Sequence, residues 1–115
     1  MTTVIERTGP RSFRLFGQFD AASAPDVADF LDPFFDEPGD ITLDLREVEF
    51  IDSTGIGVLV RVAQQLHSPG RLVVQSPQHN VRRAIDLAGL LVQPNVEISD
   101  PEPDPGVVTG IEEPP

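Results

Sequence analysis

A chain of 115 residues suits one hydrophobic core, but its 39% hydrophobic content and twelve prolines indicate that part of it lies outside that core. Its 19 acidic residues outnumber its 8 basic ones, for a formal charge of −11, which disfavours direct nucleic-acid binding because phosphate recognition depends on clustered Lys and Arg. The absence of cysteine excludes disulfides and thiolate sites, and the lack of a signal-peptide core or of an apolar run of about 20 residues predicts a cytoplasmic protein without membrane contact.

The first predicted elements are a strand and a helix. Residues 11–19 read as a strand that contains Phe13 and leads to Gly17. Ser23 has the place of a helix N-cap, followed by Pro25 and Asp26, residues that suit the first turn. The spacing then predicts one apolar helix face, and Pro38-Gly39 ends this element. The residues of that face are Val27, Leu31, Phe34 and Phe35.

The middle of the chain repeats this alternation. Residues 41–45 form a half-buried strand, and residues 48–51 either extend it or lead into a turn. A second helix is indicated by the helical spacing of Ile56, Leu59, Val60, Ala63 and Leu66. Residues 72–74 predict a short buried strand, residues 81–88 a third helix that ends at Gly89, and residues 96–98 a last strand.

Strands that alternate with helices of this length indicate βαβ units. We therefore expect an α/β fold with a mainly parallel or mixed sheet of four to five strands and about three helices packed on it. From Asp100 onward the chain has five acids, no base and five prolines, a composition that cannot offset its ordering entropy by burying apolar surface. We expect one domain over residues 1–99 and a disordered acidic tail over 100–115. Without the tail, 14 acidic and 8 basic groups remain, a charge of −6.

The segment with chemical content is Asp52-Ser53-Thr54-Gly55, where a strand ends and a helix begins. Functional groups in open α/β sheets usually lie at such places. A hydroxyl here is next to unpaired N–H groups and the positive end of the helix dipole, a position that can hold a phosphate. Alternatively, Asp52 or Ser53 only caps the helix, although a cap does not explain two glycines in its first turns. Gly55 and Gly57 would leave the backbone bare for a protein partner.

Other kinds of site match less well. A dinucleotide fingerprint would need a glycine at Val60, and a nucleophile elbow would need one at Ile51. His67 and His79 lie near turns without a companion motif, so we interpret them as solvated side chains. The carboxylates lack the pattern of a calcium loop. We predict no metal site and no cofactor.

The sequence LDLREVEFIDSTGIGVLV resembles the signature of STAS domains, specifically of bacterial anti-sigma factor antagonists. The preceding LFGQFDAASAPDVADF and the later LVVQSPQHNVRRAIDLAGL resemble the family's first strand and helix and its last strand, loop and helix. The resemblance covers about residues 12–98 and implies a single STAS domain. It departs from the family pattern after the last strand, where the acidic tail replaces a further helix.

The resemblance also implies a function. Members of this family are not enzymes; they bind an anti-sigma factor that is a serine kinase, and so release a sigma factor for transcription. The kinase phosphorylates the serine after the aspartate, here Ser53, which ends binding, and a PP2C-type phosphatase restores the antagonist. The residues that match the family's partner surface are Gly17, Asp20, Asp52, Ser53, Thr54, Gly55, Ile56 and Gly57.

Two further hypotheses stay open. An unphosphorylated STAS scaffold subunit of a lipid-transport or stress-signalling assembly would keep the fold without the switch. A small hydrolase with Ser53 as nucleophile would need a base and an oxyanion site, neither of which the sequence identifies.

Overall fold

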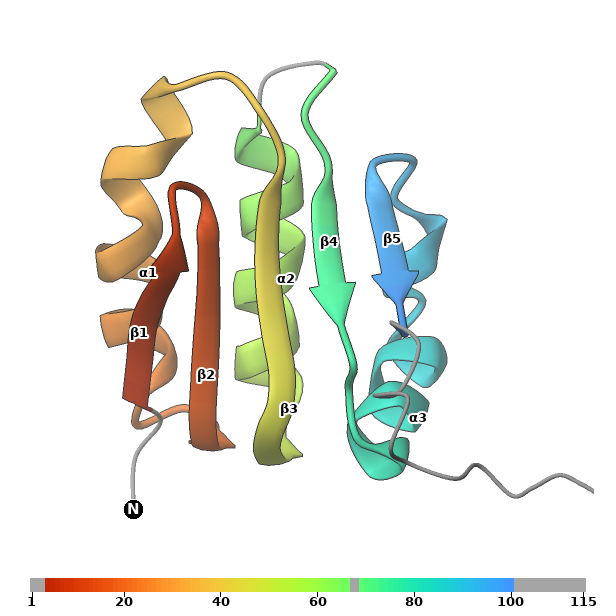
Figure 1. Ribbon diagram of the computed structural model, residues 1–115. Coiled ribbons are helices and arrows are strands. Elements are labelled where there is room, and N and C mark those ends of the chain that lie inside the picture. The colour runs from red at the N-terminus through yellow and green to blue at the C-terminus, as the bar shows by residue number, and fades with distance from the viewer. Residues whose placement is uncertain (1–3, 67–68, 101–115) are drawn as a thin grey trace, which may run out of the picture.

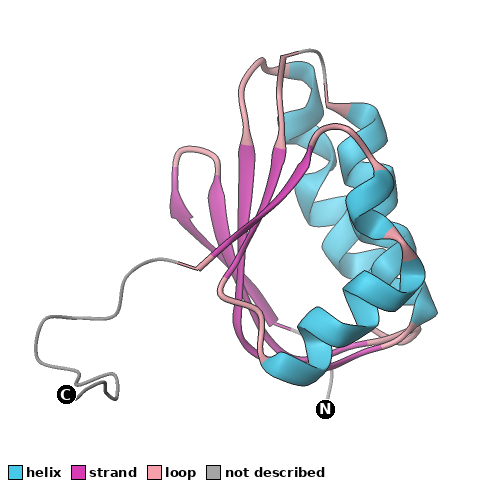
Figure 2. Cartoon of the chain, turned by 90° about the vertical axis from the view of Figure 1, so that its right-hand side faces the viewer, coloured by secondary structure: helices cyan, strands magenta, loops and turns pink. Residues whose placement is uncertain are grey.

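The computed structural model describes residues 4–66 and 69–100, in which a sheet forms one layer and the helices form a second (Figures 1 and 2). The strands are β1 (Val4–Gly9), β2 (Ser12–Phe19), β3 (Ile41–Ile51), β4 (Leu72–Gln75) and β5 (Val96–Ser99). The α-helices are α1 (Ala24–Leu31), α2 (Ser53–Gln65) and α3 (His79–Ala88), and two 3-10 turns are η1 (Asp32–Asp36) and η2 (Leu90–Val92). The predicted α/β class, with a mixed sheet and three helices, is confirmed.

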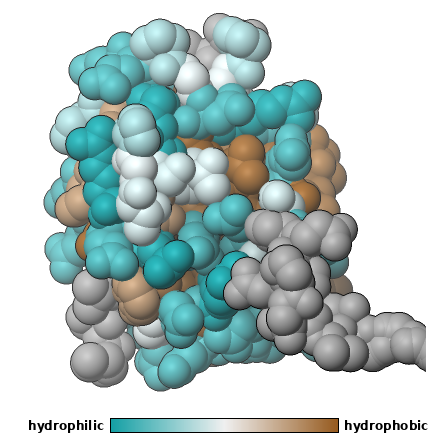
Figure 3. All heavy atoms as spheres, in the orientation of Figure 1, coloured by the Kyte–Doolittle hydropathy of each residue, from teal (hydrophilic) through white to brown (hydrophobic). Residues whose placement is uncertain are grey.

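The order of the strands in the sheet follows their order in the chain, β1-β2-β3-β4-β5. β1 and β2 form an antiparallel hairpin, and every later neighbouring pair is parallel. Parallel connections are right-handed, so three crossovers that all advance in one direction place their helices on one face of the sheet. Figure 2 shows this arrangement, with the helices on one side only. On the face without helices, hydrophilic residues surround the few apolar ones (Figure 3).

The core lies between the two layers. Ile41, Leu43 and Leu45 of β3 are fully buried at alternate positions, as the predicted strand pattern requires. Leu59 of α2 and Ile85 of α3 are fully buried against the same face. Within the described residues, no helix has both the length and the apolar character needed to cross a bilayer.

Two elements near the N-terminus differ from the prediction. The edge strand β1 was not predicted, because its sequence VIERTG pairs two apolar with two charged residues and has no strand-like alternation; Ile5 is only half-buried. The first helix was predicted to continue to Phe35, but α1 ends at Leu31 and the chain continues as η1. Pro33 explains the change, because a proline interior to an α-helix removes a hydrogen bond and clashes with the preceding turn.

The later elements agree more closely with the sequence. Residues 48–51 extend β3, and Gly89 ends α3 with a φ of 76°, a left-handed conformation that glycine adopts without strain. The predicted tail lies outside the described residues except for Asp100, whose Oδ2 is 3.6 Å from Nη1 of Arg82.

Candidate functional site

The Asp-Ser-Thr-Gly segment lies where β3 ends and α2 begins, at the carboxyl edge of the sheet (Figure 1). Phe19, the last residue of β2, pairs with Ile51, the last residue of β3. The N–H of Asp52 donates to the carbonyl oxygen of Phe19 at 3.3 Å. The turn that contains Asp20 and the turn that contains Asp52 are therefore neighbours, as expected for the ends of adjacent parallel strands.

Asp52 is the N-cap of α2. Its backbone is extended, with φ −114° and ψ −174°, and its Oδ1 accepts hydrogen bonds from the N–H groups of Thr54 (2.9 Å) and Gly55 (3.1 Å). These bonds satisfy two of the donors that a helix start leaves unpaired. Of the two residues that the sequence suggested as caps, Asp52 has this role, and Ser53 is the first residue of the helix.

Ser53 is exposed, and so is its neighbour Thr54. Within the part of the chain that the structure describes, the Ser53 hydroxyl makes no hydrogen bond, so no side chain is in place to take its proton as a general base would. The hydroxyl is instead open to another molecule. Among the described residues there is also no group of three or more His, Cys, Asp or Glu side chains arranged to hold a metal ion.

The two glycines of the motif have different environments. Gly55 is buried, and a Cβ added to it would lie 2.4 Å from the carbonyl oxygen of Phe19 and 2.9 Å from Cγ1 of Ile51. Only glycine lets the start of α2 approach the strands this closely. Packing against the sheet, and not a bare surface for a partner, therefore explains the glycine at position 55. Gly57 is exposed, its φ is not positive, and a Cβ there would meet nothing within 4 Å. Packing does not explain Gly57, although glycine inside a helix costs about 0.8–1.0 kcal/mol relative to alanine.

The neighbouring turn holds the other predicted partner residues. Gly17 has a φ of 88°, next to an irregularity in the pairing of β2 with β3. The carboxylate of Asp20 accepts from the N–H groups of Ala22 (3.1 Å) and Ser23 (3.3 Å). Asp20 therefore organises the turn, while remaining partly accessible.

Ser23 is the N-cap residue of α1, as predicted, but its side chain does not make the usual capping bond. The side chain is fully buried. Its Oγ donates to the carbonyl oxygen of Gln18 at 2.9 Å and accepts from the N–H of Asp20 at 3.2 Å. The hydroxyl thus joins the end of β2 to the start of α1, across a single turn, a role that the sequence position does not distinguish from capping.

Phe50 is a surface residue of this edge that the sequence did not single out. It is 47% exposed, whereas Val48 and Ile51 are buried. Val48 pairs with Gly17 and Phe50 with Gln18, so Glu49 is an extra residue on β3. A bulge of this kind shifts the alternation by one residue and turns the aromatic ring outward.

The start of α3 lies against the same end of β3. The side-chain amides of Gln78 and Asn80 donate to the carbonyl oxygens of Arg46 (2.9 Å) and Glu49 (2.8 Å). These bonds replace the pairing that β4 no longer offers, because β4 ends opposite Asp44. His79, the first residue of α3, is exposed, as predicted for a solvated side chain, and His67 lies outside the described residues.

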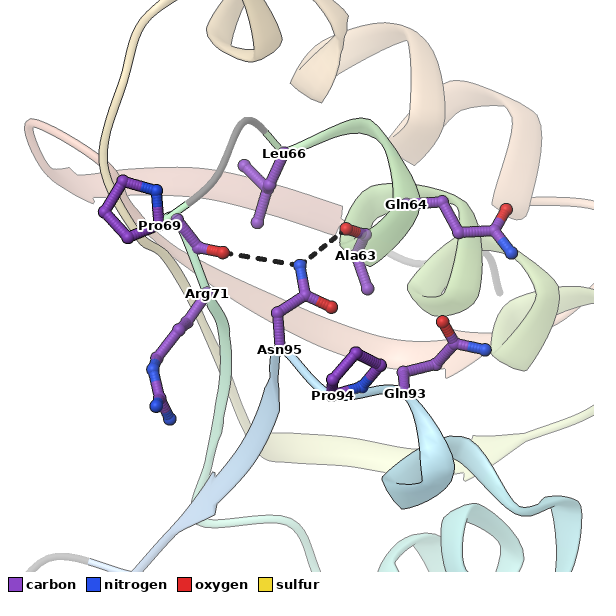
Figure 4. Close-up of a pocket in the computed structure, with 9 residues that line it drawn as sticks. Ala63, Gln64, Leu66, Pro69, Arg71, Gln93, Pro94 and Asn95 are labelled. Carbon is purple, nitrogen blue, oxygen red and sulfur yellow. Dashed lines mark hydrogen bonds between the residues drawn. The ribbon is translucent and has the colours of Figure 1, made fainter.

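A depression of about 470 Å³ lies at the end of α2 opposite to Ser53 (Figure 4). Its central side chain, Asn95, donates to the carbonyl oxygens of Ala63 (2.7 Å) and Gly70 (3.3 Å). Arg71 extends away from this amide in Figure 4 and pairs with Glu97 at 3.0 Å. The Asn95 amide thus joins the end of α2 and the loop before β4 to the start of β5.

Comparisons with known proteins agree with this geometry. Residues 2–99 match the model of the STAS domain. The anti-sigma-B factor antagonist of Bacillus subtilis (strain 168) is 31% identical over 75 residues, which are 64% of this chain and 69% of that protein. A solved structure, that of the anti-sigma factor antagonist SpoIIAA in its unphosphorylated form, has a TM-score of 0.64 at 15% identity and covers 87% of this chain and 89% of its own. The resemblance read from the sequence is confirmed: this chain belongs to the STAS domain family, among relatives named anti-sigma factor antagonists.

Proposed function

We propose that this protein is an anti-sigma factor antagonist that binds an anti-sigma factor with serine kinase activity and thereby releases a sigma factor. The kinase phosphorylates Ser53, the complex dissociates, and a PP2C-type phosphatase restores the antagonist. The observation that carries the proposal is the hydroxyl of Ser53, exposed and without a hydrogen bond within the described residues, at the first position of α2. The relationship to a protein named an anti-sigma-B factor antagonist supports the same role. Such a regulator acts in the cytoplasm.

The proposed binding surface is the carboxyl edge of the sheet around Ser53. Gly17, Asp20 and residues 52–57 would form this surface, and Phe50, an exposed aromatic residue near the end of β3, would extend it. Buried aromatic anchors contribute strongly to many protein interfaces. Gly55 is buried beneath this surface, whereas Ser53, Thr54 and Gly57 are exposed on it.

The effect of a phosphate at Ser53 follows from the cap. A phosphoserine adds about −1.5 to −2 charges at pH 7. The Asp52 carboxylate already occupies the Thr54 and Gly55 N–H groups, so the phosphate adjoins a negative charge and has fewer helix-start donors to compensate it. Within an interface the phosphate would lose its water and would be repelled by the Asp52 carboxylate, and both effects weaken binding. Changing a complex from almost fully bound to almost fully free requires about 5.5 kcal/mol.

The first test is mass spectrometry of the full chain after incubation with ATP and extract from its native cells. We expect one phosphate on Ser53 and none in Ser53→Ala. Thr54→Val is the matched control, because Thr54 is the exposed hydroxyl next to Ser53. A phosphate on Thr54, or none at all with an active kinase present, would contradict the switch and leave the unphosphorylated scaffold as the better hypothesis.

The second test measures affinity for the kinase that this experiment identifies. We expect Ser53→Ala to retain binding and stoichiometric phosphorylation to lower the affinity by about four orders of magnitude, since about 5.5 kcal/mol at about 1.4 kcal/mol per tenfold change corresponds to about 10⁴-fold. Equal affinity of the two forms would overturn the proposal.

A further inference from the structure

A shallow groove lies between α1 and α2, next to the Ser53 site. It has a volume of about 270 Å³ and lies between Ala24, Pro25 and Ala28 of α1 and Gly57, Val58 and Arg61 of α2. Its walls are mostly small and apolar. Pockets for drug-sized ligands and cofactors usually measure about 300–1,000 Å³. The groove therefore suits a single protein side chain better than a small molecule.

The groove is continuous with the proposed switch. Ser53, Gly57 and Arg61 are spaced four residues apart, so they form one row along α2, and all three are exposed. The row spans about 12 Å, at 1.5 Å per residue. Thr54, which also lines the groove, adjoins Ser53. A partner that contacts Ser53 and follows the helix reaches the groove without leaving the surface.

Gly57 and Arg61 each have a property that the fold does not explain. Gly57 leaves the helix without a side chain although a Cβ would meet nothing within 4 Å. Arg61 is the single charged residue of α2, and within the described residues it forms no ion pair or hydrogen bond. The result is an open, apolar surface with one available cation at its end.

We infer that the kinase partner of the proposed function places an apolar side chain in this groove over Gly57 and a carboxylate against Arg61. The inference rests on the proposed function and adds to it the chemistry of the partner segment. The inserted side chain can approach the α2 backbone closely only because Gly57 has no side chain. The exposed cation selects an acidic neighbour of the inserted residue, because opposite charges at an interface favour encounter and register.

The sharpest test is Gly57→Ala in the full chain, measured with the purified kinase that phosphorylates Ser53. Because alanine is the better helix former and has free space here, we expect the Tm to rise by about 3–8 °C. We expect the Kd for the kinase to rise at least tenfold. Gly57→Leu, which fills the groove, should raise it further. Opposite signs for stability and binding distinguish a contact role from a folding defect.

The second variant is Arg61→Gln, which removes the charge and keeps much of the side-chain length. We expect about a fivefold to tenfold loss of affinity and a weaker dependence of the Kd on salt concentration. Gln64→Ala is the matched control, since Gln64 is exposed on the same helix and lines the distant depression. It should bind as the wild type does.

The outcomes separate the inference from the function on which it rests. Unchanged kinase affinity in Gly57→Ala and Gly57→Leu, with the wild type bound, would overturn the inference and leave the proposed function intact. A lower Tm in Gly57→Ala would also overturn it, because the glycine would then be needed for folding. A wild-type protein that binds no serine kinase would refute the proposed function and the inference together.

Discussion

The two faces of the α2 start differ in what determines their residues. On the inner face, Asp52 caps the helix and Gly55 lies against Phe19 and Ile51. On the outer face, Ser53 and Gly57 are exposed and make no side-chain contact that the fold requires. Six consecutive residues thus contain two sets of constraints, interleaved at the period of a helix.

This difference explains why a short motif can be specific for a function. The inner residues fix where the helix begins and how closely it approaches the sheet. The outer residues are presented by that geometry at the carboxyl edge, where parallel α/β sheets place their functional groups. Changes to the inner face should therefore act on stability, and changes to the outer face on binding or modification.

Gly55→Ala is expected to have the largest effect on stability. The new Cβ would lie 2.4 Å from the backbone oxygen of Phe19, which cannot rotate away as a side chain can. The helix start must shift, and we expect a loss of about 3 kcal/mol, as for strong overpacking. Urea unfolding followed by circular dichroism measures it. Gly57→Ala is the matched control, and a loss of similar size in both variants would remove the distinction between the faces.

Asp52→Ala should have a smaller effect on the same face. The substitution leaves the N–H groups of Thr54 and Gly55 without their acceptor, and loss of a cap typically costs about 1 kcal/mol. Asp52→Asn keeps an oxygen in place and should be nearly as stable as the wild type, because Asn and Asp cap about equally well. Equal losses in Asp52→Ala and Asp52→Asn would show that the charge, and not the hydrogen bonds, stabilises the helix start.

Most of the fold was predictable because its signals are local. The alternation at Ile41, Leu43 and Leu45 and the helical spacing from Ile56 to Leu66 each lie within one element and agree with the structure. The position of Ser53 at a helix start followed from the same local reading.

What the sequence did not predict depends on how the end of β2 meets its neighbouring elements. The bulge at Glu49 turns Phe50 outward, and it is visible only in the pairing of β3 with β2. Ser23 has the sequence position of a cap, but a carbonyl at the end of β2 is the acceptor of its hydroxyl. Gly55 and Gly57 look equivalent in the motif, and the close approach of Phe19 and Ile51 to Gly55 distinguishes them.

Ser53→Ala should have the smallest effect on stability, and this near-absence of effect is what defines the outer face. The hydroxyl is exposed and makes no hydrogen bond within the described residues, and Asp52 supplies the cap, so its removal leaves no buried group unpaired. We expect a change within about 0.5 kcal/mol in urea unfolding, as for an ordinary surface position. A loss near that of Asp52→Ala would mean that Ser53 shares the capping role, and the serine would then belong to the inner, structural set of residues. A neutral result, combined with loss of phosphorylation, would show that this position is determined by a partner and not by the fold.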